Sequence, residues 1–526
     1  MAGCLQGDRV AVVGAGPGGL AVAKHLLEQG ADPIVLERGD DLGGQWNAGS
    51  AHSAVWPGMR TNTNRTMTAF SDLEHAAGTP MFPRAEQVHA YLRRYAERFA
   101  VAPRVRTHAE VLDVQPAGDR WAVRWTEAGG VPVHEVVDGV VIASGRFGTP
   151  AFPDIPGLAA FADHGRLLHA RDFRSRDELR GQRVLVLGSS ISALEIASEL
   201  AGDDTIAVIS SCRAPRYVIP KLVAGVPSDW RFFTAVAALA GAALGPEAAG
   251  AGLRAAVLAA AGDVTAVVGP APHPDVLLAG LSQCQHHHVH LAEGRIDPRP
   301  APVAVEGRRV VFADGSEAEV DAIVCATGYR LDLPFLDAGT QALLGADGKQ
   351  IDLHARTFHP DLPGLGFVGQ FVLHGPYLPV LELQARWLAG VWAGSVPAPS
   401  HEQLRAGVAA HREARPMLAA DLHHVLAAQL AGHLGVTPDL ERRPELAADL
   451  LLGPLVPERY RLDGPGALPD APERLRRALD AFGPAGRPPA GPAELGLLSA
   501  VAGALDDPAL TAVADRLAGR AMPAAA

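Results

Sequence analysis

Cysteine is scarce in the 526-residue chain, which has only Cys4, Cys212, Cys284 and Cys325. These four are scattered, with no C-x-x-C pair and no metal-ligand spacing. The sequence therefore predicts a reduced, cytoplasmic chain without a redox disulfide. It predicts no metal site either. The histidines at 286–288 and 290 have no Cys or carboxylate partner at ligand spacing, and consecutive histidines cannot all face one ion.

An excess of positive charge and a long apolar run are also missing. The chain carries 46 basic and 58 acidic side chains, a formal net charge of −12, and has no basic stripe. Such a surface repels nucleic acid and anionic membranes, so neither is an expected partner. Residues 1–8 leave no room for a secretory signal before the first strand-like run. Residues 232–245 fall short of the ~20 needed for a membrane span, so we expect a buried helix there and no integral membrane segment.

A glycine-rich turn near the N-terminus joins a strand-like run at 10–13 to a helix former at 20–27. The turn contains Gly14, Gly16, Pro17 and Gly19. In the dinucleotide-binding fingerprint, the first glycine makes the tight turn, the second lets a pyrophosphate approach, and the third lets helix pack on strand. The pyrophosphate would lie on the helix N-terminus. Glu37 ends the next apolar run, where its carboxylate can accept hydrogen bonds from ribose hydroxyls.

A second turn of the same kind follows the strand-like residues 183–187. It contains Gly188, Ser189, Ser190, Ser192 and Ala193. Small residues thus replace the second and third glycines. Glu37 stands 23 residues after Gly14, and the same step from Gly188 reaches Ser211, with Arg213 close behind. A carboxylate repels a ribose 2′-phosphate, whereas serine and arginine can bind one. The first turn therefore favours an adenosine with free ribose hydroxyls, and the second favours NADPH.

An internal repeat supports two related nucleotide-binding units. Residues 138–145 run from Asp138 to Gly145 through an apolar strand, and residues 321–328 repeat this pattern from Asp321 to Gly328. Each follows one of the glycine-rich turns by more than a hundred residues. Elsewhere the patterns predict a helix over 83–99, strands over 105–114, 121–125, 288–291 and 309–312, and a helical stretch over 222–268.

Taken together, these motifs resemble the flavin-containing monooxygenases of the class B flavoprotein type, from Arg9 to about Gly466. Besides the two turns, the resemblance rests on residues 43–46, 61–62, 70–72, 326–329, 369–370, 382–386 and 453–454. The identifying motif of that family, F-x-G-x-x-x-H-x-x-x-[YF], aligns on Gly165, His169 and Phe173, but Asp163 stands in its first position and Phe161 lies two residues earlier. The related Baeyer-Villiger enzymes carry Trp where Phe173 stands, which favours the flavin-containing monooxygenase branch.

The resemblance implies an α/β fold with two Rossmann-like dinucleotide-binding domains, one for FAD and one for NADPH. It divides the chain into a first part of a discontinuous FAD domain (1–158), an NADPH domain (159–320) with a helical insertion at about 222–268, a second FAD part (321–465), and a helical C-terminal extension (466–526). Short amphipathic helices near Leu475 and Leu497 would serve packing or self-association, so a homodimer is an open expectation.

The resemblance also implies the chemistry. NADPH would reduce FAD, the flavin would take up O2 as a hydroperoxide, and a nucleophilic nitrogen or sulfur of a small molecule would attack it. Asn62 is carried over as the catalytic asparagine, while a role in a local turn is its structural alternative. Trp46 beside the first turn would pack on a ring system or fill a domain seam. The cofactor contacts carried over are Gly14, Gly16, Pro17, Gly19, Glu37, Arg38, Gly44, Gln45, Trp46, Thr61, Asn62, Val111, Gly145, Gly188, Ser189, Ser190, Ser192, Ala193, Arg213, Thr327, Gly328, Gly369 and Gln370.

Two other reactions stay open on sequence grounds. One is Baeyer-Villiger oxygenation of a ketone, and the other is a non-oxygenating NADPH-dependent flavoprotein. A pyridine-nucleotide disulfide reductase would also use two glycine-rich turns, but that chemistry relays electrons through adjacent thiols, which the chain lacks. Nothing in residues 222–268 names a functional group of the substrate.

Overall fold

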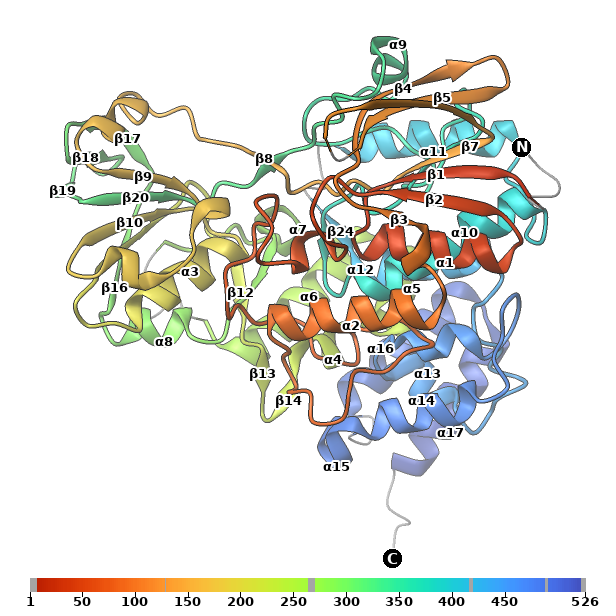
Figure 1. Cartoon of the computed structure of the whole chain (residues 1–526). Coiled ribbons are helices and arrows are strands. Elements are labelled where there is room, and N and C mark those ends of the chain that lie inside the picture. Colours follow the sequence, from red (N-terminus) through yellow and green to blue (C-terminus); the bar gives the residue numbers. More distant parts are fainter. Residues whose placement is uncertain (1–6, 128, 264–269, 416–419, 488–490, 522–526) are drawn as a thin grey trace, which may run out of the picture.

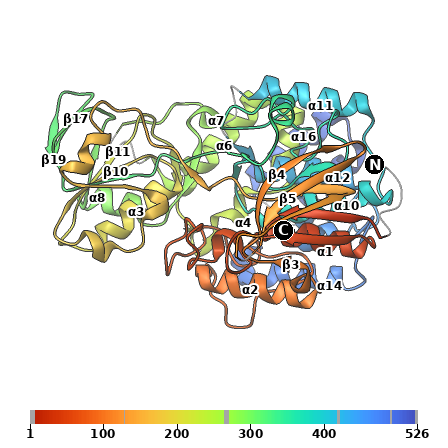
Figure 2. The ribbon, with the colours of Figure 1, turned by 45° about the horizontal axis from the view of Figure 1, so that its top comes forward.

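The computed structural model describes residues 7–127, 129–263, 270–415, 420–487 and 491–521. Figure 1 shows two lobes of unequal size: a smaller one built from the yellow and green middle of the chain, and a larger one built from both ends. The view turned by 45° in Figure 2 keeps the lobes apart, with α6 (Pro246–Ala261) and α7 (Val276–Ala279) between them. The chain therefore leaves the larger lobe and later returns to it.

A five-stranded sheet forms the centre of the larger lobe. Its order is β22 (Leu365–Phe367), β7 (Gly139–Ile142), β1 (Arg9–Val13), β2 (Asp32–Leu36) and β3 (Val105–Arg106). All neighbours are parallel, with Val12 opposite Val35 on one side and Val141 on the other. Because β1 is central and covered on both faces, Val10 and Val12 are fully buried. This burial explains the uninterrupted apolar run before Gly14.

The second sheet repeats the order of the first. Its strands are β9 (Arg166–His169), β20 (Ala322–Cys325), β10 (Arg183–Leu187), β11 (Ala207–Ser211) and β16 (Ile296–Arg299). Asp138 Oδ2 accepts a hydrogen bond from Arg9 N at 2.8 Å, and Asp321 Oδ2 accepts one from Arg183 N at 2.7 Å. Each repeated aspartate thus holds the start of a central strand, which confirms the expected pair of related units.

One expected boundary is wrong. β20 pairs with both β10 and β9, so it is a strand of the second sheet although it lies beyond the boundary expected at 320/321. The return to the larger lobe comes after Cys325, because the repeated aspartate belongs to the unit whose central strand it holds. Two short strands, β8 (Thr149–Pro150) and β21 (Tyr329–Arg330), pair antiparallel where the chain crosses between the lobes.

Each unit also carries an antiparallel three-stranded sheet. It directly precedes the strand of the repeated segment, which is β7 in the first unit and β20 in the second. The first consists of β4 (Glu110–Ala117), β5 (Arg120–Thr126) and β6 (Pro132–Val137), and the second of β17 (Pro302–Glu306), β18 (Arg309–Phe312) and β19 (Glu317–Glu319). The strands expected around 105–114, 121–125 and 309–312 are therefore confirmed, with a break between β3 and β4.

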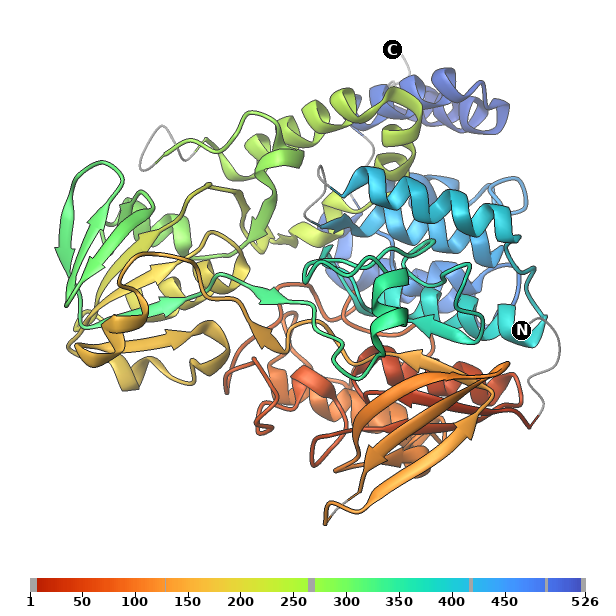
Figure 3. The ribbon, with the colours of Figure 1, turned by 90° about the horizontal axis from the view of Figure 1, so that it is seen from above.

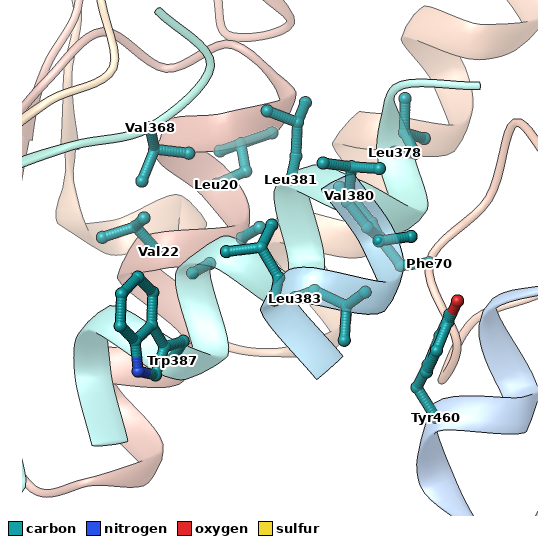
Figure 4. Packing of buried hydrophobic residues seen from close by; sticks show 14 of the residues in the cluster. Leu20, Val22, Phe70, Val368, Leu378, Val380, Leu381, Leu383, Trp387 and Tyr460 are labelled. Atoms are coloured by element: carbon teal, nitrogen blue, oxygen red, sulfur yellow. The ribbon is translucent and has the colours of Figure 1, made fainter. Parts of the chain in front are cut away.

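The main hydrophobic core lies between α1 (Pro17–Glu28) and α10 (Leu378–Ala393). Figure 4 shows Leu20 and Val22 of α1 beside Val380, Leu381 and Leu383 of α10. The helix expected over 83–99 is α2 (Ala85–Arg98), whose buried positions recur at helical spacing and join the same core. The helix that follows the first glycine turn is thus held firmly in the larger lobe.

The middle of the chain departs from expectation in two places. Residues 222–227 form a hairpin, β13 (Leu222–Val223) with β14 (Val226–Pro227), before the helices α4 (Ser228–Phe232), α5 (Ala235–Leu244) and α6. The helix expected over 232–245 is present as α5, but it is only half-buried, whereas a buried helix was expected. The strand expected at 288–291 is α8 (His287–Ala292), because His287 and Leu291 are buried at helical spacing. Residues 264–268 of the expected helical stretch lie outside the described residues.

Helices dominate the rest of the larger lobe. They are α9 (Ala338–Leu343), α11 (His401–Ala414), α12 (His423–Leu434), α13 (Ala447–Leu452), α14 (Ala471–Leu479), α15 (Gly483–Gly486), α16 (Pro492–Leu505) and α17 (Pro508–Ala521). α14 contains Leu475 and α16 contains Leu497, which confirms a helical C-terminal region. Leu498 packs with Val236 of α5 in a separate core, and Figure 3 shows these helices side by side. In the described part of the chain, no helix has the length and apolar character to cross a membrane.

Candidate functional site

The first glycine turn is held by close backbone contacts. Gly14 has φ +102°, and a Cβ there would lie 2.7 Å from Ala143 O. A Cβ on Gly19 would lie 1.9 Å from Gly14 O, so only glycine lets α1 pack this closely on the turn. Gly16 is different, because its nearest neighbour would be Gly44 Cα at 3.7 Å. Space is therefore left over the helix start, where the fingerprint expects a pyrophosphate.

The N-terminus of α1 is not capped by a side chain. Gly16 is the N-cap with extended backbone (φ −72°, ψ −178°), and Pro17 occupies the first turn. The unpaired N–H groups and the dipole of the helix make this end a site for an anion. Gly44 and Gln45 belong to a 3₁₀ turn, η1 (Gly44–Trp46), that stands against it, since Gly43 N donates to Ala15 O at 2.8 Å. These residues fit a dinucleotide phosphate.

Glu37 joins β2 to the glycine turn. Its Oε2 accepts a hydrogen bond from Ala15 N and its Oε1 accepts one from Gly39 N, both at 2.8 Å. Each carboxylate oxygen has further lone pairs, so the side chain can still accept from ribose hydroxyls. Arg38 is exposed and lies beside Gly148. Val111 lies on β4 and packs on the core under the sheet.

The second glycine turn has the same geometry with different residues. Gly188 has φ +133°, and a Cβ there would lie 2.5 Å from Ala326 O. Ser190 is the N-cap of α3 (Ile191–Ala201) and makes no side-chain cap, so this helix start is open to an anion as well. Ala193 is fully buried where the first turn has Gly19, while Ser192 is exposed. The loss of two glycines therefore leaves the turn intact.

A cavity that is open to solvent lies beside this second turn and is lined by Gly188, Ser189, Cys212, Arg216 and Arg299. Arg299 is paired with Asp297, whereas the one hydrogen bond of Arg216 goes to Leu281 O at 3.5 Å. Burial lowers the pKa of Arg216. Arg216 is thus free to bind an anion in this cavity.

The residues that the sequence predicted to bind the 2′-phosphate, Ser211 and Arg213, are placed less well than Arg216 to contact a ligand in this cavity. Arg213 is exposed and does not line this cavity. Ser211 is 1% exposed, and its hydroxyl donates to Pro300 O at 2.5 Å. The spacing rule leads to the end of β11, but it did not single out Arg216, which follows Arg213 by three residues and lines the cavity.

The loop that carries Thr61 and Asn62 is pinned from two sides. Thr61 N donates to Pro83 O at 2.9 Å, and Asn64 donates through N and Nδ2 to Asp229 Oδ2 at 2.8 and 3.0 Å. Burial raises the pKa of Asp229 to about 6 although Asn64 opposes this. Asn62 Oδ1 is buried and has no hydrogen-bond partner among the described residues. Sequence reasoning missed Asp229, which lies 165 residues from the loop that it holds.

Gly369 and Gln370 follow β22 at the same edge of the sheet as the first turn. Gly369 N donates to Gln384 Oε1 at 3.0 Å, which fixes the backbone. The Gln370 side chain is 4% exposed, and both atoms of its amide lack a hydrogen-bond partner in the described ranges. Unpaired buried polar atoms are rare in folded proteins, so Gln370 and Asn62 are fit to contact a bound ring system.

The two crossings between the lobes are tied to each other. Gly145 (φ +75°) and Gly328 (φ +88°) lie three residues beyond the ends of β7 and β20. Thr327 Oγ1 donates to Ala151 O at 2.6 Å, and His169 Nε2 lies 2.9 Å from Gly328 O. Since Arg171 N donates to His169 Nδ1, the neutral imidazole with its proton on Nε2 satisfies both contacts. Burial lowers the pKa of His169, in keeping with this form.

The departure at Asp163 has a structural explanation. Phe161 is fully buried, and its ring packs against Gly165, where a Cβ would lie 2.5 Å from Phe161 Cζ. Asp163 is exposed. Phe173 is buried against Trp56, with ring centroids 5.5 Å apart. The aromatic ring thus contacts the motif glycine from a position two residues earlier.

The structure therefore gathers the expected residues into two groups. Gly14, Gly16, Pro17, Gly19, Glu37 and Gly44 meet at one helix start, and Gly188, Ser189 and Ser190 meet at the other. Trp46 is partly buried and packs against the main core, which agrees with the alternative that this side chain fills a seam. Within the described residues, no three His, Cys, Asp or Glu side chains are grouped to hold a metal ion. Cys212, Cys284 and Cys325 are free thiols, and Cys4 lies outside the described residues.

The chain is similar to known proteins in sequence and in fold. The flavin-binding monooxygenase-like family matches residues 7–480. Flavin-containing monooxygenase 5 of Oryctolagus cuniculus is 28% identical over 488 residues, covering 88% of this chain and 90% of that protein. The N-oxide-forming dimethylaniline monooxygenase 2 of Rattus norvegicus is 28% identical over 485 residues, covering 87% and 89%. The structure of S-allyl-L-cysteine S-oxygenase from Allium sativum superposes with a TM-score of 0.62 at 23% identity, covering 90% of this chain and 98% of that chain. The chain therefore belongs to the flavin-binding monooxygenase-like family and is an FAD-dependent monooxygenase that uses NADPH.

Proposed function

We propose that this monooxygenase transfers one atom of O2 to a nucleophilic nitrogen or sulfur of a small molecule. The pair of uncapped helix starts carries the proposal. The first is followed by the carboxylate of Glu37, which suits the free ribose hydroxyls of FAD. The second lies beside Arg216, which suits the 2′-phosphate of NADPH. Arg213 stays a prediction for the same contact.

Two further features support oxygenation of nitrogen or sulfur. A curated relative of similar length is described as forming N-oxides. Phe173 stands where the resemblance places Trp in Baeyer-Villiger enzymes, and its ring is buried against Trp56. FAD and NADPH supply the redox chemistry when bound. Ketone oxygenation is the competing outcome of the test below.

The residues of the chain would position the cofactors and exclude water. The uncapped helix starts would bind the pyrophosphates. Asn62 can donate and accept through one amide, so its unpaired Oδ1 would hold a group of the reacting ring or of bound NADP⁺ in register. Asp229 and Asn64 would keep the Asn62 loop in place. No general base is needed, because the substrate itself is the nucleophile.

We propose that the protein acts in the cytoplasm and that its substrates are a small molecule and O2. Its three free thiols at 212, 284 and 325 suit a reducing compartment. The core that joins α5 to α16 and α17 lies within one chain, so a homodimer would need another surface of these helices. Chromatography with light scattering tests that assembly.

A substrate screen tests the proposed reaction. Amines, sulfides and ketones are compared for substrate-dependent NADPH consumption, with mass detection of one added oxygen atom. We expect turnover of an amine or a sulfide. Turnover of ketones alone would establish Baeyer-Villiger chemistry instead, and NADPH consumption without product from any class would reject the proposal. Replacing Asn62 by Asp should uncouple NADPH consumption from product formation, and a fully coupled Asn62→Asp enzyme would reject the role of Asn62.

A further inference from the structure

A second cavity lies next to Gln370 in the larger lobe. It is small and partly open to solvent, and it is lined by Arg146, Gln370, Phe371, Arg356, Asp421 and His411, among others. Arg146 directly follows Gly145, at the edge of the sheet where β7 ends. The cavity therefore begins beside two residues, Gly145 and Gln370, that the family resemblance assigns to the cofactors.

The Nε atom of Arg146 is buried without an acceptor. The side chain is 7% exposed, and its Nε has no hydrogen-bond partner in the part of the chain that the structure describes. Its one aromatic contact is with the adjacent Phe147, whose ring centroid lies 5.9 Å from Cζ. A guanidinium has five N–H donors and stays charged, so burial without an acceptor is costly. Burial lowers the pKa of Arg146, which is the signature of that cost.

The acidic groups near Arg146 are already committed to other partners. Asp421 forms a two-point ion pair with Arg356 at 2.8 and 2.6 Å. Asp347 accepts hydrogen bonds from two backbone N–H groups, of residues 349 and 350, and faces Arg415 at 3.9 Å. Burial raises the pKa of Tyr377 to about 12, so that hydroxyl is neutral. The cavity therefore keeps the uncompensated positive charge of Arg146.

The remaining polar groups of the cavity are neutral. Burial lowers the pKa of His411 to about 3, and His411 Nε2 lies 3.1 Å from Gln350 Oε1. Gln370 adds an unpaired amide that can donate to the same ligand as Arg146. Every Asp and Glu of the sequence lies at a described position, and none forms an ion pair with Arg146. Arg146 is therefore free to pair with an anionic ligand.

We propose that the Arg146 cavity binds the carboxylate of the substrate, so that the enzyme prefers small nucleophiles carrying an anionic group. The inference rests on the proposed function for the position of the reacting ring near Gln370. Arg146 and Gln370 would hold the carboxylate by charge-assisted hydrogen bonds, which fixes one end of the substrate. Phe371, which lines the same cavity, would contact its apolar part. Arg146 is then a specificity-determining residue.

A pair of probes that differ in charge and not in length tests the proposal. The purified flavoprotein is given NADPH, O2 and either 3-(methylsulfanyl)propanoate or 3-(methylsulfanyl)propanamide, and the sulfoxide is measured by mass. We expect kcat/KM to be about tenfold or more higher for the carboxylate. In Arg146→Met this ratio should fall toward one. Arg476→Met is the matched control, because Arg476 is an exposed arginine of α14, and it should keep the ratio.

Binding without turnover supplies a second measurement. Calorimetry with butanoate and butanamide, in the absence of NADPH, should give about tenfold tighter binding of butanoate to the wild-type protein. Arg146→Lys should keep part of this difference and Arg146→Met should lose it. The wild-type comparison alone decides the matter if Arg146→Met does not fold.

The outcomes separate this proposal from the proposed function. Equal binding of butanoate and butanamide, an unchanged ratio in Arg146→Met, or a loss of FAD or NADPH affinity in place of carboxylate affinity would overturn the anion site. Sulfoxide formation from both probes at equal rates would also overturn the anion site, but it would support the oxygenation of sulfur. Arg146-dependent binding of butanoate with no sulfoxide from either probe would support the anion site and count against oxygenation of sulfur.

Discussion

Replacing Glu382 by glutamine should destabilise the larger lobe by roughly 3 kcal/mol. Glu382 lies on α10 and is 2% exposed. Its carboxylate accepts hydrogen bonds from Ser71 N at 2.8 Å, Ser71 Oγ at 2.5 Å and Arg461 Nη2 at 2.7 Å. Lys24 of α1 and Arg461 also pair with Asp72, at 2.5 and 3.3 Å. The buried network thus joins the helix of the first glycine turn to α10 and to the chain near residue 461.

The magnitude follows from the ionisation of Glu382. Burial opposes the charge, but Arg461 and Arg386 outweigh it and lower the pKa from 4.5 to about 2. This difference corresponds to roughly 3 kcal/mol, the lower end of the ~3–5 kcal/mol lost when one partner of a buried ion pair is removed. Because the folded pKa is depressed, the stabilisation is present above pH 4.5 and is lost as the pH falls from 4.5 toward 2.

Thermal unfolding, followed by far-UV circular dichroism and by the release of flavin fluorescence, measures the effect. Glu382→Gln should lower the Tm by roughly 4 °C at pH 7 and should flatten the loss of stability in acid. Asp470→Asn is the control, since Asp470 is half-exposed in its pair with Arg474 and should cost no more than about 0.5 kcal/mol. A Glu382→Gln protein that melts with the wild type and keeps its acid slope would refute the reasoning.

Three further changes test the cofactor turns and the loop beside them. Gly19→Ala should abolish FAD retention on desalting, because its Cβ would lie 1.9 Å from Gly14 O; a fully flavinated variant would contradict this. Asp229 has a raised pKa of about 6, so the contribution of this carboxyl group to the stability of the wild type should be largest below pH 4 and should fall as the pH rises through 6. Urea midpoints at pH 4.5 and 7.5 should show this fall in the wild type and not in Asp229→Asn. Arg216→Ala should raise KM for NADPH more than for NADH, and more than Arg213→Ala does, since Arg216 lines the cavity; the reverse order would assign the phosphate to Arg213.

The features that sequence predicted well are local or repeated. The two glycine turns could be predicted from the spacing of their own residues. The repeated aspartates at 138 and 321 indicated two related sheets, because each accepts a hydrogen bond from the start of the central strand of its own unit. The boundary at 320/321 was wrong because a sequence repeat does not say to which sheet its strand belongs. The strand expected at 288–291 was wrong because four residues are too few to separate alternation from helical spacing.

The features that sequence missed depend on contacts across the fold. Asp229 holds the Asn62 loop only because α4 reaches it from the other lobe's insertion. Arg216 and Arg146 are ordinary arginines in the sequence, and their role follows from burial without an acidic partner. Glu382 and Arg461 stand 79 residues apart, yet they meet in the core. Such roles follow from tertiary burial, which no local pattern encodes.

Turnover under ¹⁸O2 tests whether the enzyme transfers one atom of O2 to its substrate. The purified enzyme is supplied with NADPH and the best amine or sulfide from the screen, and the product mass is compared with that from ¹⁶O2. We expect a product that is two mass units heavier than the product formed under ¹⁶O2, in amounts that match the NADPH consumed. The other oxygen atom should appear in water. A product without the label, or NADPH oxidation that yields only hydrogen peroxide with every substrate class, would contradict this expectation.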